Sequence, residues 1–384
     1  MSSRLISLMA TATVLACGTT PALAKNQLND TGMLQCLTSG GYLTSSCANT
    51  GQDGSLGRDV ERPNAKDGRL GFSFVRVCNS GVPAGEGSCP KQPELGPLPD
   101  QWGCTLDRVT GLLWEVKTSD GGSRDYRNTY TNFGDKRAGD VSRYPRMVNA
   151  TGLCGKKNWR LPSPNELLSI ADHGVPSPGP TIDTQWFPNT VSNGMWTDAP
   201  YTPVPEEGRT VTFYYGNAGI AMRYFGLGVR LVSKPVGHAE RFVANGDEVT
   251  DTSTGLIWRR CSEGQAWTGG ACSGSPAEFY GWHNSLNYAK SVAQATGVAW
   301  RVPNIKELFS IVDTLRWSPA IDPAYFPQTS SQTCYWSSTP DATPPDEGFS
   351  AAARCVGFNV GEANSAGFDD FDNPRFLRLV RNAD

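Results

Sequence analysis

The sequence predicts an α+β fold built from two tandem modules, each with short strands, one or two helices and long loops. Three observations predict it. First, NWRLPSPNELLSIAD at residues 158–172 returns as AWRVPNIKELFSIVD at residues 299–313, with eight identities in fifteen positions. Second, the chain is rich in Gly, Pro, Trp and Tyr and modest in charge, which is typical of short strands, turns and ordered loops. Third, the cysteines that follow the N-terminal segment are even in number, which favours disulfides.

The self-similarity continues on both sides of this phrase, in the same order and at offsets of 139 to 148 residues. We therefore divide the chain into an N-terminal extension at residues 25–100, a first module at 101–234 and a second module at 238–384. Modules of about 130 residues are large enough to be domains in their own right. The other matching pairs are DRVTGLLW (107–114) with DTSTGLIW (251–258), TIDTQWFPNT (181–190) with AIDPAYFPQT (320–329), MWTDAP (195–200) with YWSSTP (335–340), and GVRLVS (228–233) with FLRLVR (376–381).

The repeated segments predict the strands of each module. A Thr-Gly turn opens each copy and leads into a short strand that places Trp114 or Trp258 in the core. VRLVS and LRLVR close the copies as alternating strands, and we expect their Arg side chains to face away from the apolar set. Outside the repeat, a strand around residues 72–77 would join the sheet of the first module, and Asn245-Gly246 indicates a hairpin.

The phrase that occurs twice predicts a capped helix. Ser163 stands at an N-cap position and Glu166 three residues later, which is the spacing of a capping box. Asn304 and Glu307 take the same places in the second copy. Apolar residues follow at helical spacing, so both glutamates are expected to satisfy backbone amides. We interpret the phrase as scaffolding and not as an active site.

The N-terminus predicts export. Arg4 precedes an apolar stretch at residues 5–16, and Ala22-Leu23-Ala24 offers a small-x-small cleavage site, so residues 1–24 are expected to be a signal peptide. A lipoprotein site with Cys17 as the lipidated residue is the minor alternative. No later segment is apolar enough to span a membrane. We expect a periplasmic, cell-surface or secreted protein.

Ten cysteines follow the predicted signal, which suggests five disulfides in an exported chain. Zinc is excluded because no two cysteines have knuckle spacing and the chain has only three histidines, which we expect to be solvated. Pairing of neighbours is the simplest hypothesis, and the spacing alone leaves the connectivity open. The neighbouring pairs are Cys36 with Cys47, Cys78 with Cys89, Cys104 with Cys154, Cys261 with Cys272, and Cys334 with Cys355.

The order TGL(L/I)W, WR(L/V)PxxxEL, IDxxxFP, (M/Y)W(S/T) and RLV resembles the Legionella-collagen-like adhesin C-terminal domain family, in two tandem copies over residues 100 to 384. The resemblance implies a C-type-lectin-like fold and a cell-surface or periplasmic binding domain without catalysis. Formylglycine-generating enzymes share that fold, but their chemistry uses reactive cysteines, which conflicts with five disulfides. We therefore do not expect an enzyme.

Binding in such folds resides in loops held by a rigid frame, and the loop at residues 117–157 is the first candidate. It carries nine Lys and Arg residues against four Asp, interleaved with tyrosines, and this mixture suits acidic glycans. An ordinary solvated loop is the alternative. The candidate binding residues are Arg124, Tyr126, Arg127, Tyr130, Arg143 and Tyr144.

The loop at residues 341–373 has the opposite charge. Asp369, Asp370 and Asp372 cluster before Asn373, and carboxylates of this kind suit calcium. The Glu-Pro-Asn type of signature of sugar-coordinating calcium lectins is missing, so a merely acidic loop is the alternative and no other cofactor is expected. The opposite charges of the two loops also allow salt-sensitive self-association.

The net charge of −3, or −4 without Arg4, excludes the concentrated basic face of a nucleic-acid-binding protein. The sequence therefore predicts an exported bacterial binding protein with adhesin-like recognition of a glycan or surface polymer. The alternative is a structural or assembly component of the envelope or of a surface appendage that binds only protein.

Overall fold

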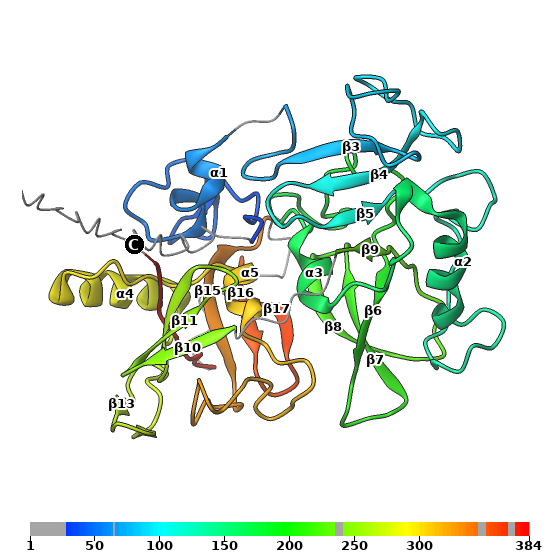
Figure 1. The fold of residues 1–384 in the computed structure, drawn as a ribbon. Coiled ribbons are helices and arrows are strands. Elements are labelled where there is room, and N and C mark those ends of the chain that lie inside the picture. The colour runs from blue at the N-terminus through cyan, green and yellow to red at the C-terminus, as the bar shows by residue number, and fades with distance from the viewer. Residues whose placement is uncertain (1–27, 64–65, 235–240, 345–350, 368–372, 384) are drawn as a thin grey trace, which may run out of the picture.

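The structure is a computed structural model that describes residues 28–63, 66–234, 241–344, 351–367 and 373–383. It contains two modules side by side, with the N-terminal extension packed beside them (Figure 1). Strands predominate and the helices are few and mostly short. Within the described part, no helix is long and apolar enough to cross a membrane.

Each module has a four-stranded antiparallel sheet of the same design. Phe74 pairs with Asp107 in the first sheet, and Phe242 pairs with Asp251 in the same register in the second. The edge strand of the first sheet therefore comes from the extension, as expected for residues 72–77. The first sheet contains β3 (Phe74–Cys78), β4 (Trp102–Asp107), β5 (Leu113–Glu115) and β9 (Val232–Ser233). The second contains β10 (Phe242–Asn245), β11 (Glu248–Asp251), β12 (Leu256–Arg259) and β18 (Val380–Asn382).

A six-stranded sheet crosses both modules, in the order β15-β16-β17-β8-β7-β6 (Figure 1). The two halves meet where Ala218 pairs with Ala363, which occupy equivalent positions in the two copies. The molecule is thus a pseudo-twofold pair of modules joined through one sheet. Its strands are β6 (Gly194–Pro200), β7 (Glu207–Thr212), β8 (Asn217–Met222), β15 (Cys334–Pro340), β16 (Ala352–Gly357) and β17 (Glu362–Gly367).

Helices α3 and α5 occupy equivalent places in the two modules. The two capping boxes that the sequence predicts are confirmed, at Ser163 with Glu166 and at Asn304 with Glu307. The helices are α1 (Arg58–Glu61), α2 (Tyr144–Thr151), α3 (Pro164–Ser169), α4 (Trp282–Thr296) and α5 (Ile305–Ser310). Short 3₁₀ turns span Asp53–Ser55, Val141–Arg143 and Leu153–Gly155, and two small hairpins pair Cys36–Leu37 with Leu43–Thr44 and Ala266–Trp267 with Cys272–Ser273.

One hydrophobic core lies between the six-stranded sheet and helices α3 and α5, and it draws residues from both modules. Trp114 and Trp258 are completely buried in it, as predicted. His173 is also completely buried, so the expectation that it is solvated is wrong. The loop that carries it lies against Thr31, whose carbonyl accepts a hydrogen bond from the His173 amide at 2.7 Å.

The five predicted disulfides are all formed between neighbouring cysteines. Two of them lie within the extension, one joins β4 to the segment before α3, and two lie within the second module. This density is consistent with an exported protein, since disulfides persist in oxidising compartments.

Candidate functional site

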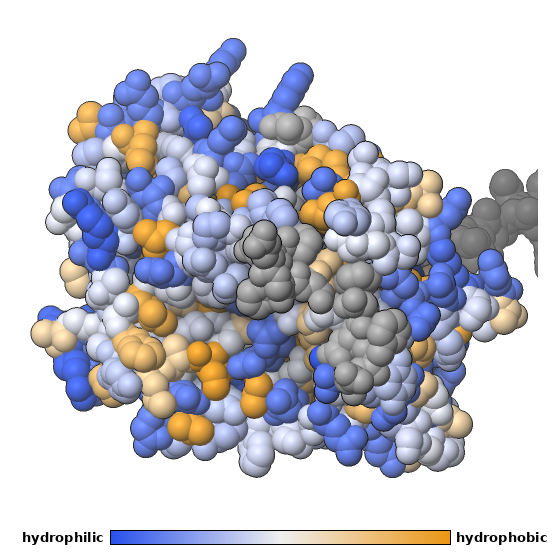
Figure 2. Space-filling view, turned by 180° about the vertical axis from the view of Figure 1, so that it is seen from behind, coloured by the Kyte–Doolittle hydropathy of each residue, from blue (hydrophilic) through white to orange (hydrophobic). Residues whose placement is uncertain are grey.

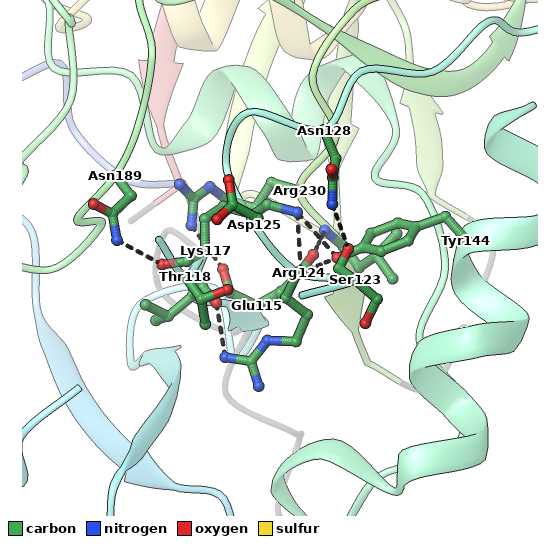
Figure 3. Close-up of polar contacts among 12 residues, drawn as sticks. Glu115, Lys117, Thr118, Ser123, Arg124, Asp125, Asn128, Tyr144, Asn189 and Arg230 are labelled. Carbon is green, nitrogen blue, oxygen red and sulfur yellow. Dashed lines mark hydrogen bonds and ion pairs between the residues drawn. The ribbon is translucent and has the colours of Figure 1, made fainter. Parts of the chain in front are cut away.

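The base of the basic loop is a buried polar cluster around Glu115, at the end of β5 (Figure 3). Its Oε1 accepts hydrogen bonds from the Tyr144 hydroxyl and from Lys117 Nζ, the latter at 3.2 Å. Its Oε2 accepts from the Leu231 amide at 3.0 Å. Because both oxygens are used, Glu115 ties together the strand that opens the module, helix α2 and the strand that closes the module.

Burial controls the electrostatics of this cluster. It lowers the pKa of Lys117 despite the neighbouring Glu115, and it raises the pKa of Tyr144 well above its ordinary value. It also lowers the pKa of Arg230 to about 10. Groups held this tightly stabilise a loop base and are not free to meet a ligand.

Arg124 turns back toward the protein and closes the loop. Its Nη2 donates to the Val116 carbonyl at 2.9 Å, and its Nη1 donates to Asn79 Oδ1 at 3.3 Å. Arg127 pairs with Asp125, with 2.7 Å between Nη2 and Oδ2. The loop is therefore ordered by its own charged side chains, several of which the sequence had suggested for binding.

The six predicted binding residues do not form one surface. Tyr144 has no exposed side-chain area and lies in the core of the first module, so its proposed role in ring stacking on a ligand is corrected. The physical reason is that residues 144–151 form helix α2, whose inner face carries Tyr144 and Val148. Tyr130 is half-buried and packs its ring 5.0 Å from that of Tyr144. Arg124 and Tyr126 are half-buried, whereas Arg127 and Arg143 are exposed.

Sequence reasoning missed three exposed aromatic residues, one in this loop and two in the segment whose backbone pairs with it. Phe133, Tyr224 and Phe225, which we call the aromatic platform, have exposed fractions of 38%, 60% and 47%. The rings of Tyr224 and Phe225 contact each other edge to face, with their centroids 4.8 Å apart. The Tyr224-Phe225 pair, one residue after the end of strand β8, is the sequence signal that could have indicated the platform.

Backbone hydrogen bonds hold the two segments of the platform together. Tyr130 and Leu227 exchange hydrogen bonds at 2.9 and 3.1 Å, and the Asn132 amide donates to the Arg223 carbonyl at 2.8 Å. Arg137 lies over the ring of Phe133, with 4.3 Å between its guanidinium carbon and the ring centroid. Exposed aromatic rings thus lie next to exposed cations, on a frame that the buried Glu115 cluster keeps in place.

The proposed calcium residues Asp369, Asp370 and Asp372 lie outside the described residues. Within the part of the chain that the structure describes, no group of three or more His, Cys, Asp or Glu side chains has the arrangement of a metal site. The calcium hypothesis therefore stays a prediction.

The Lcl C-terminal domain family matches residues 103–233 and again residues 247–381, which together make up more than half of the chain. The chain belongs to the Lcl C-terminal domain family. The two matches confirm the tandem copies that the repeat predicts, and the family suggests a surface-associated function. No curated protein matches the chain in sequence.

The two Lcl C-terminal copies share a buried arginine two residues before their closing strands. Arg230 Nη1 donates to the Glu115 carbonyl and Arg378 Nη1 to the Arg259 carbonyl, which is the equivalent position. Both guanidinium groups lie over an aromatic ring, that of Phe187 or Phe326. The expectation that these arginines face away from the core is wrong. They satisfy buried carbonyls and so belong to the frame.

Proposed function

We propose that the protein is an exported bacterial binding protein that recognises an acidic glycan or surface polymer through the aromatic platform, on a C-type-lectin-like frame. Binding, and not catalysis, is the proposed role. The observation that carries the proposal is that Arg137 lies over the exposed ring of Phe133, on a segment whose backbone pairs with the one that leads into the exposed Tyr224 and Phe225. Ring faces pack against the apolar faces of sugars, and cations pair with carboxylate or sulfate groups.

The charges around the platform support an acidic ligand. Lys136, Arg137 and Arg143 are exposed on the same loop as Phe133. Asp135 engages Arg137 in a surface ion pair, which contributes little free energy and is readily exchanged for a ligand anion. This surface therefore has both an apolar and a cationic component.

One face of the molecule gives little support for assembly through a large apolar interface (Figure 2). On the face shown in Figure 2, the strongly apolar residues form small groups among polar ones. A stable assembly through a large interface with another protein would need a broad apolar patch instead. A negative glycan screen would favour the alternative function, in which the protein binds only other proteins of the envelope.

The test is a glycan and polysaccharide screen on oxidised protein of residues 25–384, with calcium and with chelator. We expect binding to acidic polysaccharides, and about a tenfold loss for Tyr224→Ala and for Phe225→Ala. The matched control is Tyr214→Ala with Tyr215→Ala, since this exposed aromatic pair, with centroids 4.5 Å apart, lies at the other end of strand β8. Loss of binding in the control and not at the platform would contradict the proposal.

The chelator separates the two candidate loops. Binding that survives chelation would assign recognition to the platform and its cations. Binding that chelator abolishes would assign it to a cation at Asp369, Asp370 and Asp372. No binding to any glycan would direct the next experiment to capture of envelope proteins.

A further inference from the structure

The edge strand of the first module is closed by the extension. The Ala84 amide donates to the Arg76 carbonyl at 2.9 Å, and the Cys78 amide donates to the Val82 carbonyl at 2.9 Å. Val77 and Pro83 form an antiparallel bridge between these bonds. An extended segment therefore covers the outer edge of β3, and the outward backbone groups of this strand are those of Arg76 and Cys78.

Strand β10 is the equivalent edge strand of the second module. Because Phe242 takes the place of Phe74 in the shared register, Ala244 takes the place of Arg76. The hairpin at Asn245–Glu248 gives the same result. Hydrogen-bonded and non-hydrogen-bonded pairs alternate along an antiparallel ladder, so the backbone N–H and C=O groups of Phe242 and Ala244 point away from β11. Over the described residues, no strand or segment bonds to the outer edge of β10, and Val243 is 49% exposed.

The outer edge of β10 is self-complementary. If two copies meet antiparallel about a twofold axis through Val243, Phe242 of one copy pairs with Ala244 of the other. The two pairs exchange four backbone hydrogen bonds, and the two Val243 side chains face each other on the outer surface of the joined sheet. The first module shows that this edge position accepts an antiparallel extended segment.

We propose that the protein self-associates through β10, with a second copy of the chain as the partner that completes this edge. Backbone bonds between short strands make a small interface, so the dimer is weak and depends on concentration. It becomes populated when copies are held close together, for example on a polymer or at a surface. The contact contains no ion pair, so the affinity of the dimer should not fall at high salt. Docking between the oppositely charged loops would weaken at high salt.

The test is sedimentation of the oxidised protein from about 1 µM to about 1 mM, at low salt and in about 1 M NaCl. We expect a monomer–dimer equilibrium at both salt concentrations. Val243→Lys places like charges opposite each other and should shift the midpoint at least tenfold upward. Ala244→Pro removes an outward N–H without breaking the ladder to β11, and should have the same effect.

The matched control is Val60→Lys, since Val60 is exposed to 43% and lies on the extension, away from β10. This variant should dimerise like the wild type. A monomer at every concentration would overturn the proposal. A dimer that both β10 variants leave unchanged would also overturn it. A dimer that dissociates at high salt would overturn it as well, because that would indicate association through the charged loops.

Discussion

At the scale of single residues, the two capping glutamates make the same contacts at different depths. Glu166 accepts from the Ser163 amide at 2.8 Å and forms a two-bond ion pair with Arg160. Glu307 does the same with the Asn304 amide, at 2.9 Å, and with Arg301. The Glu166 side chain is 21% exposed, and that of Glu307 is 5% exposed. The internal repeat therefore offers one interaction in two environments.

We predict that Glu307→Ala destabilises the protein by about 3 kcal/mol, because it empties an almost fully buried site and leaves the half-buried Arg301 guanidinium with Asn382 Oδ1 in place of its carboxylate partner. Glu166→Ala should cost only about 1 kcal/mol, since water reaches Arg160 and the loss is mainly that of a cap. Urea unfolding of both variants measures the difference. Equal costs would show that depth does not determine the contribution of these caps.

Three carboxyl groups are buried where the extension meets the second module. Burial, together with the neighbouring Asp30, raises the pKa of Asp53 to about 8 and that of Asp59 to about 10. Lys306 lies nearby, but its Nζ donates to the backbone carbonyls of Asp30 and Ser169. In the described residues, Asp59 Oδ2 has no hydrogen-bond partner.

We predict that this cluster makes the protein less stable as the pH rises. The pKa of Asp59 is 3.8 in the unfolded chain and about 10 in the folded one. Between these values the folded state binds the extra proton, so stability is complete below pH 3.8 and falls as the pH increases toward 10. Asp59→Asn, which is neutral throughout, should raise the free energy of unfolding by at least about 1 kcal/mol at pH 8. It should have less effect at pH 5.

Urea unfolding of the Asp59→Asn variant and of the wild type at pH 5 and pH 8 measures the difference in their free energies of unfolding. Asp120→Asn is the control, because this exposed carboxyl has a lowered pKa and the opposite sign. A gain in the free energy of unfolding that is the same at both pH values would mean that packing explains the change, and not the protonation of Asp59.

At the scale of elements, short sequence motifs predict those helices and hairpins that contacts between neighbouring residues determine. Helices α3 and α5 follow from their caps, and the hairpin between β10 and β11 follows from Asn245-Gly246. The sequence analysis places residues 144–151 in a loop, and the structure shows helix α2 there, with Tyr144 and Val148 four residues apart on its inner face. Its proline and the charges around it hid this spacing.

The long-range elements have no such signal. The joining of β8 to β17 depends on the meeting of Ala218 and Ala363, which are small residues without a distinctive pattern. The aromatic platform was missed for the same reason, since its two segments are brought together only by the backbone pairing of residues 130–132 with 223–227. Self-similarity predicts two modules, but it cannot predict how the modules pack.

At the scale of the whole molecule, arginines cross the boundary between the modules. Arg209 of the first module donates to the carbonyls of Thr314, Val360 and Gly361 in the second, at 2.8 to 3.1 Å. Arg354, at the equivalent place in the second module, donates to Asn217 Oδ1 at 2.8 Å. Together with the common sheet and core, these bonds make each module part of the environment of the other.

We therefore predict that both modules unfold in a single transition. Calorimetry of the oxidised protein should give a calorimetric enthalpy close to the van't Hoff enthalpy, the sign of one cooperative unit. Arg209→Ala should lower the midpoint of that one transition by several degrees, because it removes the hydrogen bonds to three carbonyls of the other module, one of them buried and two half-buried. Arg223→Ala, whose bonds stay within the first module, should have a smaller effect. Two separate transitions would mean that each module folds independently of the shared sheet.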